Sequence, residues 1–452
     1  MADMPTRSEA QDGATGSVRR VFNVHPGEGQ AAVCGFAFFF CLFTGYFMLR
    51  PIRETLGIAA GVDKLQWLFT ATFIVMLAAV PCFGWLARRV PRAHFVTWSY
   101  SFFAATLAGF SAWLYLQPGN LWAARAFYVW LSVFNLFVVS VAWSLMADVF
   151  RTDQAKRLFA FIAAGASTGG LAGPVLGAAL AGVLGPPGLI LLSAVFLGVT
   201  LPMKSWLMRW RAAGGAGMQD PASVQAQEPP ADPARAADAA ASPSRPIGGG
   251  ILAGATRTFT SPLLAGMAAF VILLATASTF LYMEQARLVA DAFSSAAERI
   301  RVFSALDFAV QALSMAAQLF LTGRLAQKLG VTFLLTIVPV LVCAGFLVLA
   351  VAPVFTVLAA VMVLRRVGEY ALVRPGREMV FTTVDAEAKY KAKNFIDTVV
   401  YRAGDAASAW VKTAVDAIGQ GATLVALVGA GCAAVWAACG YLLGRRADKR
   451  RV

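Results

Sequence analysis

The sequence predicts an all-α polytopic membrane protein, with twelve transmembrane helices in two six-helix halves. Of its 452 residues, 59% are hydrophobic and only 14% are charged, which is far more apolar than a soluble globular protein. The apolar residues form twelve blocks, each close to the ~20 residues that one helix needs to cross a bilayer. Because backbone groups in lipid must be satisfied within the protein, we expect these blocks to be helices.

The expected spans and the segments between them follow in chain order. A polar N-terminal tail, residues 1–30, is expected to be cytoplasmic. The first half, 31–210, holds spans at 31–50, 65–87, 93–115, 121–147, 158–184 and 188–208. The second half, 259–443, holds spans at 262–284, 302–322, 331–351, 353–373, 395–418 and 421–443. Between the halves, residues 211–258 are rich in Ala, Pro and Gly without apolar periodicity, so we expect a disordered cytoplasmic linker. Residues 444–452 form a basic cytoplasmic tail.

The distribution of Lys and Arg predicts the orientation. Alternate loops are basic, whereas the loops near 117–120, 185–188, 350–354 and 419–421 carry no charge. Basic loops stay on the cytoplasmic side, so both termini are expected inside a bacterial inner (plasma) membrane. Much of the formal charge of +14 reflects this asymmetry, and we expect no nucleic-acid partner. The oligomeric state is left open.

The residues that enzymes need are missing. The two histidines are His25, in the tail, and His94, near a helix start, and no Gly-Lys dipeptide marks a phosphate-binding loop. The sequence therefore predicts no enzyme activity, no cofactor and no metal.

Charged residues recur inside the expected spans, where they are costly and usually face a cavity or a partner. Span ten contains Arg365, Arg366 and Glu369, and span eleven contains Arg402, Asp405, Lys412 and Asp416. Pairing along the helix is expected for Lys412 with Asp416. In span ten one Arg lacks a local partner, which favours a cavity that holds an anion.

The motif Arg-Pro-x-Arg-Glu occurs twice, at 50–54 and 374–378. Pro51 is expected to end or kink the first helix and to aim Arg50 and Arg53 inward at the outer side. Arg374 and Arg377 are expected at the cytoplasmic side. Either each pair contacts the solute or latches the path, or both copies are topology anchors.

Two short motifs resemble the major facilitator superfamily. "GWLARRVP" (84–91) and "GRLAQKLG" (323–330) fill equivalent loops of the two halves, and "GGLAGPVLG" (169–177) is similar to a segment of that superfamily's antiporters. The resemblance implies a facilitator-type fold, in which spans one, four, seven and ten line the central path. Span four ends at Asp148, and span seven ends with Glu284 and Arg287. We expect the glycines at 165, 169, 173 and 177 to serve close helix packing rather than substrate contact.

Residues 374–408 resemble the nucleotide (ATP/ADP) translocase family of plastids and intracellular bacteria. Arg377, Glu378 and Met379 match its K-E-M segment, and Lys391, Lys393, Ile396 and Asp397 match its K-x-K-x-x-I-D segment. "LRPIRETLG" in span one is similar to its K-x-x-R-D-t segment. The sequence departs from the family where Arg replaces Lys at 50 and 377, and where Asp405 follows in place of a Gly- and Lys-containing turn.

These observations predict a secondary-active transporter that moves an anionic, phosphorylated solute by alternating access, with ATP/ADP-type exchange implied by the resemblance. A proton-coupled exporter of amphipathic small molecules, with Glu369 or Asp405 as the proton site, is the alternative. A non-transporting membrane sensor or scaffold is a third. The candidate solute-binding residues are Arg50, Arg53, Asp148, Glu284, Arg287, Arg365, Arg366, Glu369, Arg374, Arg377, Glu378, Lys391, Lys393, Asp397, Arg402 and Asp405.

Overall fold

The computed structural model describes residues 25, 27–90, 92–215, 251–382, 384, 392–419 and 421–449. Throughout this part of the chain the regular structure is helical. Most of the expected linker, at residues 216–250, lies outside the described residues, as does most of the N-terminal tail.

The first half contains six spans. They are α2 (Gly29–Ala59), α3 (Leu65–Arg89), α4 (Arg92–Leu116), α5 (Leu121–Val149) and the two parts of α6 (Thr152–Trp210). A short 3-10 turn, η1 (Val62–Lys64), precedes α3, and a π turn, η2 (Arg211–Gly215), follows α6. Inside α6, Gly185 adopts a φ of 60°, a conformation that suits glycine, and Pro186 and Pro187 follow it. The chain therefore reverses there, and α6 holds two spans.

The second half repeats this pattern. A short helix, α9 (Ile251–Thr260), leads into α10 (Pro262–Ala292), α11 (Ala296–Ala317) with η3 (Gln318–Thr322), and α12 (Gly323–Val351). Gly330, with a φ of 72°, separates the two spans on either side of it. Then come α13 (Phe355–Gly368), η4 (Glu369–Val373), α14 (Arg374–Phe381), η5 (Ile396–Val400), α16 (Tyr401–Ala417) and α17 (Gly421–Lys449).

Among the described residues, seven continuous helical stretches are long and apolar enough to cross a membrane. Two of them contain the breaks at Gly185 and Gly330 and hold two spans each. Helix α4, the segment α13–α14 and the segment η5–α16 complete the predicted set of twelve. The sequence-based fold class is confirmed.

Several predicted boundaries are wrong. Pro51 does not end the helix, because α2 continues to Ala59 and buries Ile52, Leu56 and Ile58 beyond it. Membrane helices tolerate an interior proline when packing offsets one lost hydrogen bond. The second Arg-Pro-x-Arg-Glu motif begins α14 rather than following the end of a helix.

Within the described residues, helices cover part of the expected linker and part of the expected C-terminal tail. Residues 251–260 are helical, and α17 extends to Lys449 instead of ending at 443. Asp448 explains the longer α17, because its carboxylate accepts hydrogen bonds from the backbone of Val331 and Thr332 and from the Thr332 hydroxyl at 2.6–3.1 Å. That contact satisfies backbone donors at the start of a span.

The glycine face of α6 packs against α2, as the sequence predicts. A Cβ added to Gly165, Gly169 or Gly173 would lie 2.2–2.6 Å from a backbone oxygen of α2. Helix α17 approaches α12 in the same way, since a Cβ on Gly444 would lie 2.3 Å from the Cα of Thr332. Small residues thus hold helix pairs together in each half.

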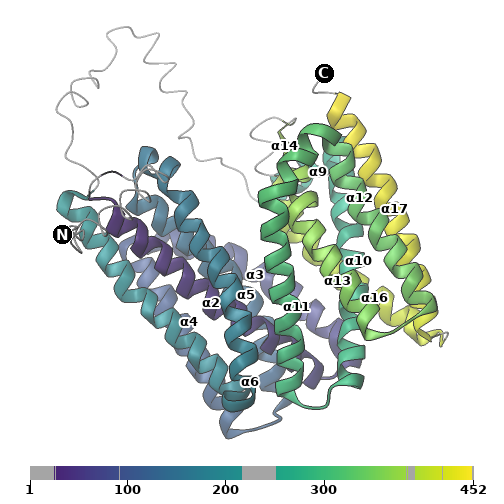
Figure 1. Ribbon diagram of the computed structural model, residues 1–452, viewed down its shortest axis with the longest axis horizontal. Helices are drawn as coiled ribbons and strands as arrows, with labels where there is room; N and C mark the ends of the chain where they lie inside the picture. Colours follow the sequence, from purple (N-terminus) through teal and green to yellow (C-terminus); the bar gives the residue numbers. More distant parts are fainter. Residues whose placement is uncertain are drawn as a thin grey trace, which may run out of the picture.

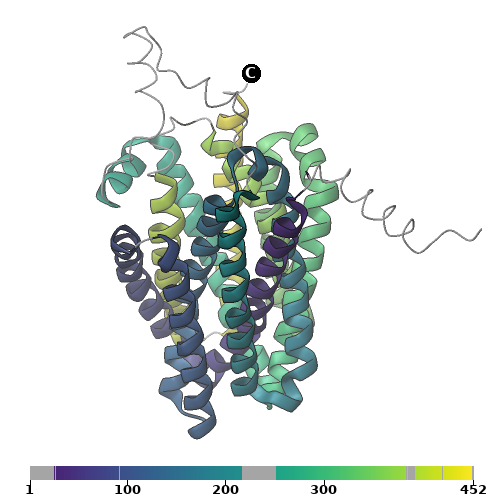
Figure 2. The same cartoon turned by 90° about the vertical axis from the view of Figure 1, so that its left-hand side faces the viewer.

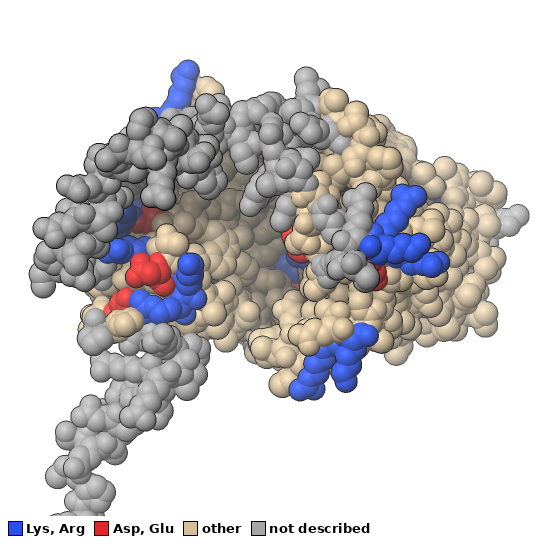
Figure 3. All heavy atoms as spheres, turned by 90° about the horizontal axis from the view of Figure 1, so that it is seen from above, with Lys and Arg blue, Asp and Glu red and all other residues tan. Residues whose placement is uncertain are grey.

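The two six-helix halves stand side by side, and the spans in each run roughly along one direction (Figures 1 and 2). They approach each other at the lower end of Figure 1. Met283, Val289, Ile300 and Phe303 of the second half join the apolar core of the first. Seen from the opposite end, Figure 3 shows a hollow between the two lobes, with acidic and basic atoms visible inside it.

Candidate functional site

A cavity of about 200 Å³ lies between the halves and is lined mainly by charged and aromatic side chains. Helix α2 of the first half contributes two arginines and a carboxylate. Helices α11, α13, η4, α14 and α16 of the second half contribute the other charges, and α10 contributes uncharged polar side chains. The charged lining consists of Arg50, Arg53, Glu54, Asp307, Arg365, Arg366, Glu369, Arg374, Arg402 and Asp405.

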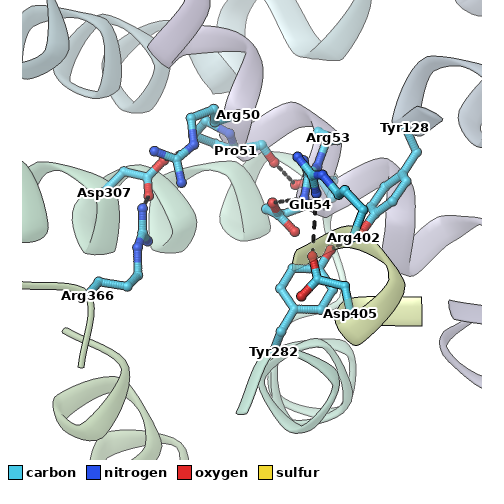
Figure 4. Close-up of polar contacts among 11 residues, drawn as sticks. Arg50, Pro51, Arg53, Glu54, Tyr128, Tyr282, Asp307, Arg366, Arg402 and Asp405 are labelled. Atoms are coloured by element: carbon cyan, nitrogen blue, oxygen red, sulfur yellow. Dashed lines mark hydrogen bonds and ion pairs between the residues drawn. The ribbon is translucent and has the colours of Figure 1, made fainter. Parts of the chain in front are cut away.

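Asp307 of α11 lies between two arginines from opposite halves (Figure 4). One of its carboxylate oxygens is 2.7 Å from Nη2 of Arg366 on α13, and the other is 3.7 Å from Nε of Arg50 on α2. The Asp307 side chain is only 7% exposed. The guanidinium of Arg50 also lies over the Phe47 ring, at 5.2 Å from its centroid.

A second cluster surrounds Glu369. The Nη1 of Arg365 donates to Glu369 at 2.9 Å and to the Ser278 hydroxyl at 2.6 Å. Arg374 lies 3.5 Å from the other oxygen of Glu369 and stacks over the ring of Tyr370. The Arg374 side chain is 58% exposed, so this cluster extends from a buried pair to an accessible cation.

A third group closes the cavity beside the junction of the halves (Figure 4). Arg53 pairs with Glu54 at 3.2 Å and lies over the ring of Tyr128. The hydroxyls of Tyr128 and Tyr282 are 2.9 Å apart and join the two halves directly. Nearby, Arg402 lies 3.5 Å from Asp405, whose carboxylate also accepts from Thr279.

The cavity has an excess of positive charge. Six arginines and four carboxylates line it, so its formal net charge is +2. Arginine presents a planar fork of donors that matches carboxylate and phosphate oxygens. In a path of low dielectric, this arrangement suits a small anion, while the carboxylates limit how tightly the anion is held.

Eight of the sixteen predicted site residues line this cavity: Arg50, Arg53, Arg365, Arg366, Glu369, Arg374, Arg402 and Asp405. The others do not. Asp148 lies in the last turn of α5, and Lys391 lies outside the described residues.

The remaining six predicted residues form ion pairs elsewhere. Arg377 contacts Asp397, and Lys393 pairs with Glu378 at 2.7 Å. Glu284 contacts Arg287 and lies 3.7 Å from Lys412. The predicted pair of Lys412 with Asp416 is confirmed, with 2.7 Å between Nζ and Oδ2.

The two Arg-Pro-x-Arg-Glu motifs do not occupy opposite mouths. Arg50 and Arg374 line the same cavity, whereas Arg377 does not. The expectation of two separate mouths is therefore wrong. The reason is that α2 and the α13–α14 segment both pass beside the cavity, which brings the first residue of each motif toward the same space.

Sequence reasoning missed Asp307, Glu54 as a lining residue, and the tyrosines 282, 370 and 401. The sequence carried a signal for Asp307, because it is a carboxylate inside the otherwise apolar expected span 302–322. It is also the missing partner of Arg366, supplied by another helix rather than by the same one. Tyrosines are common in membrane helices and carry no such signal.

Comparisons with known proteins agree with this architecture. One solved structure that shares the fold is a bacterial homologue of the human lysosomal transporter Spinster in an inward-facing and unoccupied conformation, with 14% identity and a TM-score of 0.57 over 94% of this chain and 99% of that one. A second is the nucleoside transporter NupG, with 13% identity and a TM-score of 0.60 over 93% of this chain and 99% of that one. A third is an inward-facing bacterial homologue of the iron transporter ferroportin, with 11% identity and a TM-score of 0.62 over 92% of this chain and 98% of that one.

At these identities the likeness shows the fold alone. No curated protein sequence matches this chain. The family model described as Major Facilitator Superfamily matches residues 31–382, which is most of the chain. This protein belongs to the major facilitator superfamily.

Proposed function

We propose that this facilitator-type transporter carries a small anionic, phosphorylated solute between the two sides of the membrane. The observation that carries the proposal is the cavity between the halves, with six arginines against four carboxylates and no lysine or histidine in its described lining. A neutral or cationic solute would leave the excess positive charge without a partner in a place where charge is costly.

Nucleotide exchange is the specific form of this proposal. It rests on the resemblance of residues 374–408 and 49–57 to the ATP/ADP translocases. Four of the matching residues in the later segment pair near α14 and η5 rather than in the cavity, Arg377 with Asp397 and Glu378 with Lys393. We propose that this ion-pair cluster shapes the second half, while the arginines of the cavity contact the phosphate.

The transport mechanism that we propose is alternating access. The halves touch at one end through Tyr128 and Tyr282 and are hollowed at the other (Figure 3). With both termini on the cytoplasmic side of a bacterial inner membrane, as the basic loops indicate, the hollow opens toward the cytoplasm. Rocking of the halves about the cavity would expose the solute to the other side.

Uptake of labelled ADP, ATP and inorganic phosphate into proteoliposomes tests the proposal. We expect at least one of these anions to enter, and to enter faster when unlabelled nucleotide or phosphate is present inside. The matched control is liposomes with Arg50→Gln protein at the same density. Failure of all three anions, together with uptake of a neutral nucleoside, would contradict an anionic substrate.

A proton-coupled exporter is the second candidate, and one observation favours it. Asp405 is a buried carboxylate in the cavity, only 6% exposed, with the neutral Thr279 as a hydrogen-bond donor at 3.2 Å and its arginine partner, Arg402, farther away at 3.5 Å. Exchange of anions that persists after an uncoupler collapses the proton gradient would exclude this candidate. Complete loss of transport with the uncoupler, and with Asp405→Asn, would favour it.

A further inference from the structure

Asp307 differs from the other carboxylates of the cavity in how it is paired. Glu54, Glu369 and Asp405 contact arginines of their own half, at most five residues away along the chain. Asp307 contacts Arg366 in its own half and Arg50 in the other. Among the ion pairs that the structure gives between described residues, Arg50–Asp307 is the one that joins the halves. Figure 4 shows the carboxylate between the two guanidiniums.

The three charges are largely removed from water. The side chains of Asp307, Arg366 and Arg50 are 7%, 12% and 22% exposed. Together they carry a net charge of +1, and without the carboxylate two guanidiniums from opposite halves would face the same space uncompensated. Removing an ion from water costs several kcal/mol unless a counter-charge is present.

Closing the hollow makes this cost larger. When the halves rock, water leaves the cavity and the effective dielectric falls, so repulsion between Arg50 and Arg366 grows. A bound anion would neutralise the pair during the movement. The empty protein needs another anion in that place, and Asp307 is positioned to be that anion.

We propose that Asp307 is an internal counter-anion, which takes the place of the solute in the empty cavity and so allows the empty transporter to change its access state. A bound solute anion competes with Asp307 for Arg50 and Arg366. The statement that a solute anion competes with Asp307 rests on the proposed function. The statement that the empty protein closes only with Asp307 charged holds for any solute.

The consequence concerns the kind of transport that the protein performs. With Asp307, an empty carrier returns across the membrane, and net uptake is possible. Without it, the carrier crosses only when loaded, and the protein becomes an obligatory exchanger. Asp307 is thus a residue that sets the transport mode rather than one that selects the solute.

The decisive experiment measures the empty protein and requires no solute. Spin labels are placed at the exposed positions Asp153 and Lys328, on the cytoplasmic ends of the two halves, after the six native cysteines are replaced. Pulsed electron paramagnetic resonance then gives the distance distribution in lipid nanodiscs. We expect empty wild type to populate both a long and a short distance, and Asp307→Asn to lose the short-distance population by tenfold or more.

Rescue separates a charge effect from structural damage. Asp307→Asn raises the net charge of the three positions from +1 to +2, and combining it with Arg366→Gln restores +1, so the short distance should return. Asp416→Asn removes a carboxylate that pairs with Lys412 outside the cavity, and should leave both populations in place. Asp307→Ser repeats the test if the Asn variant does not reach the membrane.

Two results would overturn the inference. One is a short-distance population that is unchanged in Asp307→Asn or Asp307→Ser; the other is an empty wild-type protein with the long distance only. A transport assay with inorganic phosphate adds an independent arm, in which Asp307→Asn should lose net uptake but retain exchange. If phosphate, ADP and ATP all fail in the wild type, the proposed function fails, and the distance measurement still decides the role of Asp307.

Discussion

The cavity depends on one side chain in particular, the guanidinium of Arg50. It faces Asp307 across the boundary between the halves and lies over Phe47. Its charge is needed at this place because Asp307 is buried between Arg50 and Arg366, and removing one member of a buried ion pair is strongly destabilising. Arg377, the second arginine of the other motif, pairs with Asp397 away from the cavity lining.

We therefore expect Arg50→Gln to abolish transport and Arg377→Gln to spare it. Breaking one buried pair costs ~3–5 kcal/mol, enough to reduce uptake per molecule by roughly 100-fold or more. Arg50→Lys should be intermediate, since charge survives but the fork of donors does not. Uptake of labelled phosphate or ADP, divided by membrane abundance, measures the effect. Equal loss in the variants at 50 and 377 would contradict a special role for the first motif.

Glu28 offers a pH-dependent contact outside the spans. Burial raises the pKa of Glu28, but hydrogen bonds from Arg157, the His25 backbone and Gln154 outweigh it and lower that pKa to about 2. The Nη atoms of Arg157 donate to both carboxylate oxygens at 2.9 Å. This bidentate pair ties the start of α2 to the start of α6.

The lowered pKa of Glu28 decides how the stability that this contact provides changes with pH. The contact contributes fully above the unfolded pKa of 4.5 and is lost as the pH falls toward 2, because the carboxylate must then be protonated. The contribution at neutral pH is at most roughly 3 kcal/mol. Thermal unfolding in detergent should show Glu28→Gln less stable than wild type at pH 7, with the difference shrinking below pH 4. A constant difference down to pH 3 would count against this pair.

At the scale of helices, close packing between α2 and α6 positions the arginines of α2. The glycines of α6 admit the backbone of α2 to van der Waals contact, which fixes where Arg50 and Arg53 project. Gly169 lies where a Cβ would be 2.5 Å from the carbonyl oxygen of Phe40, whereas a Cβ on Gly198 of the same helix meets nothing within 4 Å.

Gly169→Ala should therefore destabilise the first half by about 1–3 kcal/mol, the usual cost of overpacking, while Gly198→Ala should be neutral. The measurement is the thermal midpoint of each purified variant, together with its abundance in the membrane. A similar drop for both variants would indicate an effect on membrane insertion, not contact with α2, as the cause, because alanine favours a helix more than glycine does.

The helices were largely predictable, and the contacts between them only in part. Hydropathy located the twelve spans because each apolar block must be helical in lipid. The helix ends near Pro51 and Arg374 were missed, since packing partners far along the chain keep these residues helical. Local spacing found the pair Lys412–Asp416. It could not find Asp307 as the partner of Arg366, because that contact depends on how α11 lies beside α13.

At the scale of the whole molecule, the contacts that close one end of the hollow hold the halves in the observed arrangement. The Tyr128 and Tyr282 hydroxyls are 2.9 Å apart, and the Trp410 indole donates to Thr70 at 3.0 Å and packs edge-on against Trp67. Each contact joins one half to the other. Alternating access requires them to separate, since the cavity can open at this end only when they do.

A crosslink across this junction should therefore stop transport without unfolding either half. In a variant without native cysteines, Trp67→Cys and Trp410→Cys are joined by a short bismaleimide that contains a cleavable disulfide. We expect the uncrosslinked variant to take up labelled phosphate or ADP, the crosslinked form to lose at least nine-tenths of that uptake, and reductant to restore it. The matched control is Trp113→Cys with Gln117→Cys, an exposed hydrogen-bonded pair at the C-terminal end of α4, where the same crosslink should have no effect. Uptake that persists across the locked junction would mean that the halves do not separate at this end during transport.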